Sequence, residues 1–206
     1  MSRNPRSICY NCYRPQSTCM CSHITPIQTN TRFVILMHPK EFRKTKNGTG
    51  HFTNLSLKNC EIFVGIDFTT HKEINEILKQ KNNNCFMLYP SKESITLNTQ
   101  NIYEQNKNMV LFLLDSTWPC SRAMLRASQN LDALPKVSFT HTKSSEFIFK
   151  EQPKDYCLST MESTLCILEL LNAQHIEDIK LEKLEQFLSP FRHMVRYQTD
   201  YTSSNK

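Results

Sequence analysis

Apolar residues in this chain gather into short runs that are separated by longer polar stretches. Residues 109–114, Met-Val-Leu-Phe-Leu-Leu, form one such run with no polar break. A run of this length that ends at a polar turn is typical of a strand buried on both faces of a sheet. Similar runs, which predict further strands, occupy residues 32–38, 61–66, 85–89, 136–139 and 147–149.

Helical patterns lie between and after these runs. Residues 71–81 place their apolar side chains on one face, as an amphipathic helix does. Ser159 and Glu162 have the spacing of a capping box, which predicts the start of another helix. Residues 181–195 follow helical spacing again, with a bend expected at Pro190. Because strands alternate with helices, we expect an α/β fold with a mostly parallel sheet.

Length and composition fit one domain with a small appendage. The chain has 206 residues, of which 39% are hydrophobic, enough for a substantial core. It lacks an apolar run of about 18 residues, so we expect no transmembrane span. The first residues contain no apolar signal-peptide region, which favours a cytoplasmic protein. With only 3 glycines, the chain offers no Gly-rich phosphate-binding loop.

A cysteine cluster lies near the N-terminus. Residues 9–21 contain CxxC followed by CxC, which uses four of the nine cysteines of the chain. In a reducing compartment, cysteines at this spacing indicate a metal site rather than disulfides. We therefore predict a structural zinc on Cys9, Cys12, Cys19 and Cys21, with His23 able to replace one thiolate. A redox pair and free cysteines are the alternatives.

Polar residues directly follow the central apolar run. Asp115, Ser116, Thr117 and the only tryptophan, Trp118, come at the carboxyl end of the predicted strand, and Pro119 is suited to the first turn of a helix. Ligands of open α/β sheets bind at this end of the strands. The alternative is a simple strand-to-helix turn, in which Thr117 caps the helix and Trp118 belongs to the core.

These four residues also carry a resemblance to a known family. Asp-Ser-Thr-Trp is similar to the Asp-Gly-Thr-Trp signature of the DTW-domain family, tRNA-uridine aminocarboxypropyltransferases related to the SPOUT class; Ser116 departs from the usual glycine. Other motifs recur in the order of the family, and together they are far more specific than any one alone. They are the cysteine cluster, His-Pro-x-Glu at 38–41, Tyr-Pro-Ser at 89–91 and Leu-Ser-Thr-x-Glu at 158–162.

The resemblance implies a fold and a reaction. The fold is a SPOUT-like, mostly parallel sheet flanked by helices with a C-terminal trefoil knot, which pattern alone would not predict. We expect a zinc-binding segment at 1–26, a catalytic domain at 27–200 and a disordered tail at 201–206. The reaction moves the 3-amino-3-carboxypropyl group of S-adenosylmethionine to a uridine ring nitrogen of tRNA, with release of methylthioadenosine. Alternatives are a SPOUT-type RNA methyltransferase and a non-catalytic zinc-containing RNA-binding module.

The resemblance also implies roles for particular residues. A carboxylate must take the proton of the uridine ring nitrogen, and Asp115 is the first candidate, followed by Glu41. Glu162 has a purely structural explanation in the capping box. The residues expected to contact the cofactor are His38, Tyr89, Pro90, Ser116, Thr117, Trp118, Leu134, Pro135, Leu158, Ser159 and Thr160.

The charge of the chain suits a nucleic-acid substrate. Lysine and arginine number 25 and aspartate and glutamate 19, so the formal net charge is +6. Contacts from basic residues to phosphates would position tRNA without reading its sequence. Any single one of these residues could instead be part of a solvated surface. The candidates are Lys40, Arg43, Lys44, Lys46, Arg122 and Arg126. The sequence makes no prediction of the oligomeric state.

Overall fold

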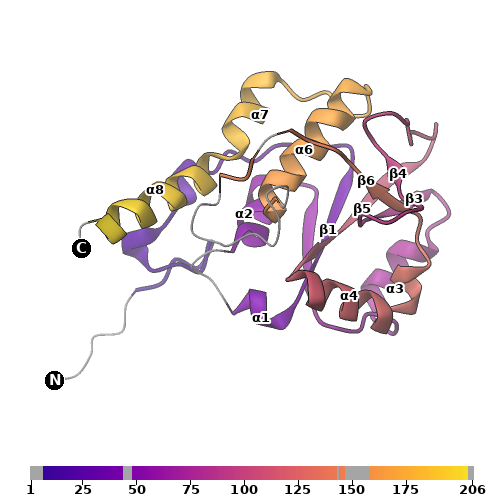
Figure 1. Ribbon diagram of the computed structural model, residues 1–206, viewed down its shortest axis with the longest axis horizontal. Coiled ribbons are helices and arrows are strands. Elements are labelled where there is room, and N and C mark those ends of the chain that lie inside the picture. The colour runs from indigo at the N-terminus through magenta and orange to yellow at the C-terminus, as the bar shows by residue number, and fades with distance from the viewer. Residues whose placement is uncertain (1–6, 44–47, 143, 147–157, 204–206) are drawn as a thin grey trace.

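A parallel sheet forms the centre of the molecule (Figure 1). The computed structural model describes residues 7–43, 48–142, 144–146 and 158–203, and within these ranges the sheet has six strands in the order β2-β1-β5-β3-β6-β4. Every neighbouring pair is parallel, which confirms the predicted α/β fold. The strands are β1 (Arg32–Met37), β2 (Cys60–Val64), β3 (Asn83–Leu88), β4 (Ile95–Thr96), β5 (Asn108–Asp115) and β6 (Lys136–Ser138).

The predicted central strand, β5, pairs with β1 on one side and β3 on the other. Its residues from Met109 to Leu113 are all buried, as expected for a strand covered on both faces. The register aligns Met37 with Asp115, so the carboxyl ends of β1 and β5 lie at the same level. The backbone N–H of His38 donates to the carbonyl of Asp115 at 3.1 Å, and this bond joins the two strand ends.

Helices cover both faces of the sheet (Figure 1). Alternate residues of β1 face opposite ways, so Phe33 and Ile35 belong to one apolar cluster and Val34 and Leu36 to the other. The first cluster is covered by α2 (Thr49–Ser56), α6 (Thr160–Ala173), α7 (Leu181–Phe187) and α8 (Ser189–Ser203). The second is covered by α3 (Lys72–Lys79), α4 (Trp118–Ala127) and α5 (Gln129–Asp132).

Three short elements complete the described structure. Helix α1 (Pro39–Phe42) follows β1, with Nδ1 of His38 accepting a hydrogen bond from the backbone of Lys40 at 3.1 Å. The 3-10 turns η1 (Gln16–Thr18) and η2 (Cys21–His23) lie in the cysteine-rich segment. No helix within the described ranges combines the length and the apolar character needed to cross a membrane.

The structure differs from the sequence-based expectation at the C-terminal helices and at α2. Residues 181–195 form two helices, because the chain turns between α7 and α8. Pro190 lies in the first turn of α8, where its missing N–H leaves no helical bond unmade. Helix α8 continues to Ser203, and helix α2 was not predicted at all.

One part of the expected fold lies outside the described residues. The strand expected at 147–149 belongs to this part. Residues 147–157 also connect β6 to α6, so the trefoil knot stays a prediction.

Candidate active site and metal centre

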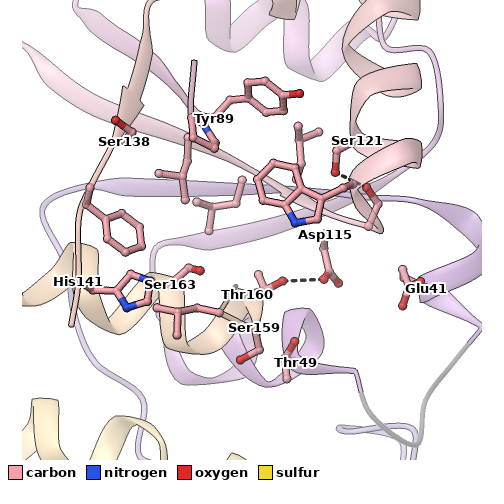
Figure 2. Close-up of a pocket in the computed structure, with 18 of the residues that line it drawn as sticks. Glu41, Thr49, Tyr89, Asp115, Ser121, Ser138, His141, Ser159, Thr160 and Ser163 are labelled. Atoms are coloured by element: carbon pink, nitrogen blue, oxygen red, sulfur yellow. Dashed lines mark hydrogen bonds between the residues drawn. The ribbon is translucent and has the colours of Figure 1, made fainter. Parts of the chain in front are cut away.

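A cleft of about 420 Å³ opens at the carboxyl ends of β3, β5 and β6 (Figure 2). This is the end at which ligands of parallel α/β sheets bind. Clefts of this size accommodate small organic ligands. The residues that line it come from the ends of β3 and β5, from the segments after these three strands, from α1, and from the starts of α2 and α6.

Asp115, the last residue of β5, lies between the starts of two helices. Its Oδ1 accepts a hydrogen bond from Oγ1 of Thr160 at 2.7 Å, at the start of α6 (Figure 2). On another side it lies against Gly50 in the first turn of α2, where an added Cβ would collide with Oδ2. Glycine therefore allows the backbone of α2 to approach the carboxylate. Helix α2 is eight residues long, and the positive end of its dipole stabilises a negative charge at this position.

Glu41 lies at the edge of the cleft on α1, and the cleft brings both predicted carboxylates to one site. It lies on the same side as Asp115 and Thr49, whereas His141 and Ser163 lie on the opposite side (Figure 2). A ligand bound in the cleft can therefore contact Asp115 near its middle and Glu41 at one end.

Two aromatic rings form one wall. Tyr89 and Trp118 meet edge to face, with their ring centroids 6.2 Å apart. Trp118 is 40% exposed and lines the cleft, so the alternative that placed it in the core is wrong. Ser116 and Ser121 share a hydrogen bond of 2.6 Å between their hydroxyls, which fixes the turn between β5 and α4. An exposed ring face of this kind can hold a flat or cationic group.

The start of α6 forms the opposite wall. Leu158, Ser159 and Thr160 all line the cleft. The capping box is complete, because Oε2 of Glu162 accepts from the backbone of Ser159 at 2.8 Å and Oγ of Ser159 accepts from the backbone of Glu162 at 3.3 Å. Oε1 of Glu162 also accepts from the backbone N–H of Glu146 at 2.6 Å. Glu162 thus holds this wall in place, as predicted, and does not itself line the cleft.

Four residues that the resemblance associates with the cofactor lie outside the cleft lining. His38 is buried as the N-cap of α1, and Thr117 is the N-cap of α4 without a side-chain capping bond. Leu134 packs into the α3 and α4 side of the core, and the carbonyl of Pro135 accepts from the backbone of Met87 at 3.0 Å. Both precede β6, while the cleft lies beyond its other end. Leu134 and Pro135 do not line this cleft, and their predicted contact with the cofactor stays a prediction.

Several lining residues had no sequence signal that singled them out. β6 has only three residues, so its apolar pattern is too short to mark a strand end clearly. The segment after it nevertheless enters the cleft, and Ser138 is held there by a 2.8 Å hydrogen bond between its hydroxyl and that of Ser94. The lining residues that sequence reasoning missed are Thr49, Leu88, Leu113, Leu114, Ser121, Ser138, Phe139, Thr140, His141 and Ser163.

The basic candidates lie on two helices beside the cleft. Lys40 and Arg43 are exposed on and just after α1, and Arg122 and Arg126 are exposed on α4. Lys44 and Lys46 lie outside the described residues.

The predicted metal ligands come together in the N-terminal segment. The Sγ atoms of Cys9, Cys12, Cys19 and Cys21 all lie within 4.8 Å of one another. Cys9 and Cys21 are 3.7 Å apart, and Cys12 and Cys19 are 3.8 Å apart. A tetrahedron with zinc–sulfur bonds of about 2.3 Å has sulfur–sulfur edges of about 3.8 Å. Two of these edges match the observed distances, and the arrangement of the four thiols is suited to one tetrahedral metal ion.

The thiols of Cys9 and Cys21 differ in how easily they lose a proton. Backbone N–H groups of Cys12 and Asn11 lower the pKa of Cys9 to about 6. Burial, together with the neighbouring thiols, raises the pKa of Cys21 to about 12. Without a cation, four adjacent thiolates would repel one another, and a bound metal would supply the compensating positive charge.

The cysteine segment packs against the body of the protein. The rings of His23 and His193 stack at 3.6 Å, which joins η2 to α8. The guanidinium of Arg14 lies over the ring of Phe52 in α2, 5.6 Å from its centroid. Met20 is buried in the main apolar cluster. A metal bound to the cysteines would thus fix a segment that supports two helices of the domain.

Comparison with known proteins agrees with this arrangement. The DTW domain matches residues 6–199, which is nearly the whole chain and includes the cysteine cluster and every wall of the cleft. This chain belongs to the DTW domain family. The match confirms the resemblance that the sequence motifs indicate.

Three curated proteins that are similar to this chain are all named as tRNA-uridine aminocarboxypropyltransferases. A Drosophila melanogaster protein named tRNA-uridine aminocarboxypropyltransferase 2 is 28% identical, over 96% of this chain and 77% of its own length. A Mus musculus protein of the same name is 25% identical, over 89% of this chain and 63% of its own. An Arabidopsis thaliana protein named tRNA-uridine aminocarboxypropyltransferase A is 27% identical, over 98% and 84%. No solved structure matches this chain.

Proposed function

We propose that this protein is a tRNA-uridine aminocarboxypropyltransferase that uses S-adenosylmethionine as the donor. The observation that carries the proposal is the position of Asp115, a carboxylate held by Thr160 inside a cleft at the strand ends of a DTW domain. The names of the relatives give the same activity.

The cleft is suited to S-adenosylmethionine by size and by its donor and acceptor groups. Its volume of about 420 Å³ lies in the range for small organic ligands. When bound, S-adenosylmethionine supplies a sulfonium that activates the carbons attached to it. The rings of Trp118 and Tyr89 would pack against it, with a cation–π contribution to the sulfonium. The residues proposed to hold it are Tyr89, Pro90, Ser116, Trp118, Leu158, Ser159 and Thr160.

Asp115 would act as the base. A uridine ring nitrogen becomes nucleophilic when it loses its proton, and a carboxylate within hydrogen-bond reach can accept that proton. Thr160 orients the Asp115 carboxylate by donating to Oδ1, and Oδ2 faces the α2 terminus. Glu41, on the same side of the cleft, is the second candidate for this role.

The choice of the attacked carbon depends on orientation. All substituents of a sulfonium are activated, so the enzyme selects one by holding it in line with the nucleophile. We propose that the polar groups opposite Glu41, namely Ser138, His141 and Ser163, help to fix this orientation. If they instead presented the methyl group to the nucleotide, the enzyme would be a methyltransferase.

A structural zinc and a tRNA substrate complete the proposal. The tetrahedral spacing of the four Sγ atoms supports zinc at Cys9, Cys12, Cys19 and Cys21. The net charge of +6 and the exposed basic residues of α1 and α4 support binding of a polyanion. The candidates for phosphate contact are Lys40, Arg43, Lys44, Lys46, Arg122 and Arg126.

Nucleoside mass spectrometry tests the proposal in cells. tRNA from cells that lack the gene should have lost a uridine derivative that carries an aminocarboxypropyl group, and the derivative should return when the gene is restored. Loss of a methylated uridine would instead support the methyltransferase. An unchanged set of nucleosides would contradict both enzymes and favour an RNA-binding module.

A further inference from the structure

A row of three aromatic rings connects the cysteine cluster to the mouth of the cleft. The ring of His51 lies 6.2 Å from that of Tyr13 on one side and 5.4 Å from that of Phe42 on the other, measured between centroids. The interplanar angles are 55° and 50°. Tyr13 belongs to the cysteine segment, His51 to α2 and Phe42 to α1. We call Tyr13, His51 and Phe42 the aromatic row.

The two outer rings of the row are open to solvent. Tyr13 is 54% exposed and Phe42 is 44% exposed, whereas His51 is buried between them. Large apolar rings are usually covered, and a group of exposed ones marks a surface that binds something. In the described part of the chain, Nε2 of His51 is also buried without a hydrogen-bond partner. The row thus presents the two exposed rings of Tyr13 and Phe42 to an incoming molecule, with the buried ring of His51 between them.

The position of the row links it to the proposed chemistry. Phe42 directly follows Glu41, which lines the cleft. His51 directly follows Gly50, which lies against Asp115. Phe42 and His51 are thus each one residue away from a position beside the cleft, and a chain resting on the row would lie near the carboxylate proposed as the base.

The charges around the row favour an anionic partner. Lys40 and Arg43 are exposed on either side of Phe42 in sequence. Unpaired RNA bases stack on aromatic side chains, and basic residues nearby neutralise their phosphates. A protein partner would also use aromatic rings, but the basic surroundings and the net charge of +6 favour nucleic acid.

We propose that the aromatic row is a platform on which unpaired bases of the tRNA substrate stack next to the modified uridine. This inference rests on the proposed function, because it places the row beside the transfer site. The nucleotides on the row would hold the RNA strand, and the adjacent uridine would enter the cleft.

The test measures base stacking directly. An unpaired RNA oligonucleotide that contains 2-aminopurine loses fluorescence when this base stacks on a ring. Wild-type protein should quench the probe, while Tyr13→Ala and Phe42→Ala should each weaken binding on the order of tenfold and reduce the quenching. Tyr13→Phe and Phe42→Tyr keep a ring and should restore both. Metal content and melting temperature establish that the variants are folded.

Tyr103→Ala provides a matched control. Tyr103 is 56% exposed, much like Tyr13, but it precedes the amino end of β5, away from the cleft. This variant should bind the probe as wild type does. If Tyr13→Ala and Phe42→Ala are folded and quench as well as wild type, or if wild type does not quench the probe, the proposal is overturned.

A transfer assay on tRNA separates this failure from failure of the proposed function. The row variants should raise the KM for tRNA and leave the affinity for S-adenosylmethionine unchanged. Normal transfer with an unaltered KM for tRNA in the variants would contradict the role of the aromatic row and leave the proposed transferase activity standing. Absence of transfer by the wild-type protein would contradict the proposed function. The quenching experiment would still decide whether the aromatic row binds RNA.

Discussion

Oγ1 of Thr160 donates a hydrogen bond to Oδ1 of Asp115 at 2.7 Å, across 45 positions of sequence. The bond joins the carboxyl end of the central strand to the first turn of α6, whose capping box is held by Glu162. The orientation of the proposed base therefore depends on two motifs that are far apart in the chain.

Replacing Asp115 tests its role as base. Asp115→Asn is nearly isosteric and should remain folded, but it cannot accept the uridine proton. We expect single-turnover transfer to fall by on the order of a hundredfold or more, with a smaller change in the affinity for S-adenosylmethionine. A melting curve of the same variant provides the control. If activity loss merely follows unfolding, Asp115 shapes the turn; if a stable variant transfers normally, Glu41 becomes the candidate.

Thr160 should affect turnover through Asp115. Thr160→Val keeps the shape of the side chain and removes the hydroxyl, so the carboxylate loses its orienting donor. We expect a lower kcat with little change in the KM for tRNA. Thr160→Ser retains the hydroxyl and should recover most of the activity. Equal kcat values in the valine and serine variants would show that the hydrogen bond has no part in turnover.

Gly50 should be intolerant of any side chain. In Gly50→Ala the new Cβ would collide with Asp115 and lie 2.8 Å from Cε of Met37. Overpacking of this kind costs about 1–3 kcal/mol, and here it also displaces the proposed base. Gly65→Ala is a matched control, since its Cβ would lie 2.9 Å from the ring of Phe68 outside the cleft lining. Both variants should melt earlier, but only Gly50→Ala should lose activity per folded molecule; equal losses would contradict the assignment.

The cysteine cluster should hold a metal that stabilises the N-terminal segment. Protein purified under reducing conditions should contain about one zinc per chain. Cys19→Ser should lose it, whereas Cys120→Ser, which alters a free cysteine in α4, should keep it. Limited proteolysis should then cut the region around η1 and η2 before the sheet domain. Wild-type protein that carries no zinc would refute the assignment.

The strands could be predicted from the sequence because their burial requires a recognisable run of apolar residues. β1 and β5 are covered on both faces, and that requirement produces unbroken apolar runs. Helix α2 has no comparable sequence pattern, since Thr49, Gly50 and Asn54 are weak helix formers. It forms because Phe52 is buried between the sheet and α6, which is a tertiary effect. The local sequence therefore made no prediction of this helix.

The same difference between local sequence patterns and tertiary packing explains which residues of the candidate site could be predicted. Asp115 and Glu41 follow buried strands and match motifs, so they could be singled out from the sequence. His141 and Ser163 reach the cleft from the segment after β6 and from the start of α6. Only the order of strands, β3-β6 beside β5, brings them there, and no local pattern encodes that order.

Donor labelling tests the central claim most directly. S-adenosylmethionine that carries ¹⁴C in its carboxyl group and ³H in its methyl group is incubated with the protein and unmodified tRNA. The account predicts ¹⁴C in the tRNA, with ³H released in methylthioadenosine, and transfer that nearly disappears in Asp115→Asn. ³H in the tRNA without ¹⁴C would contradict the account and identify a methyltransferase.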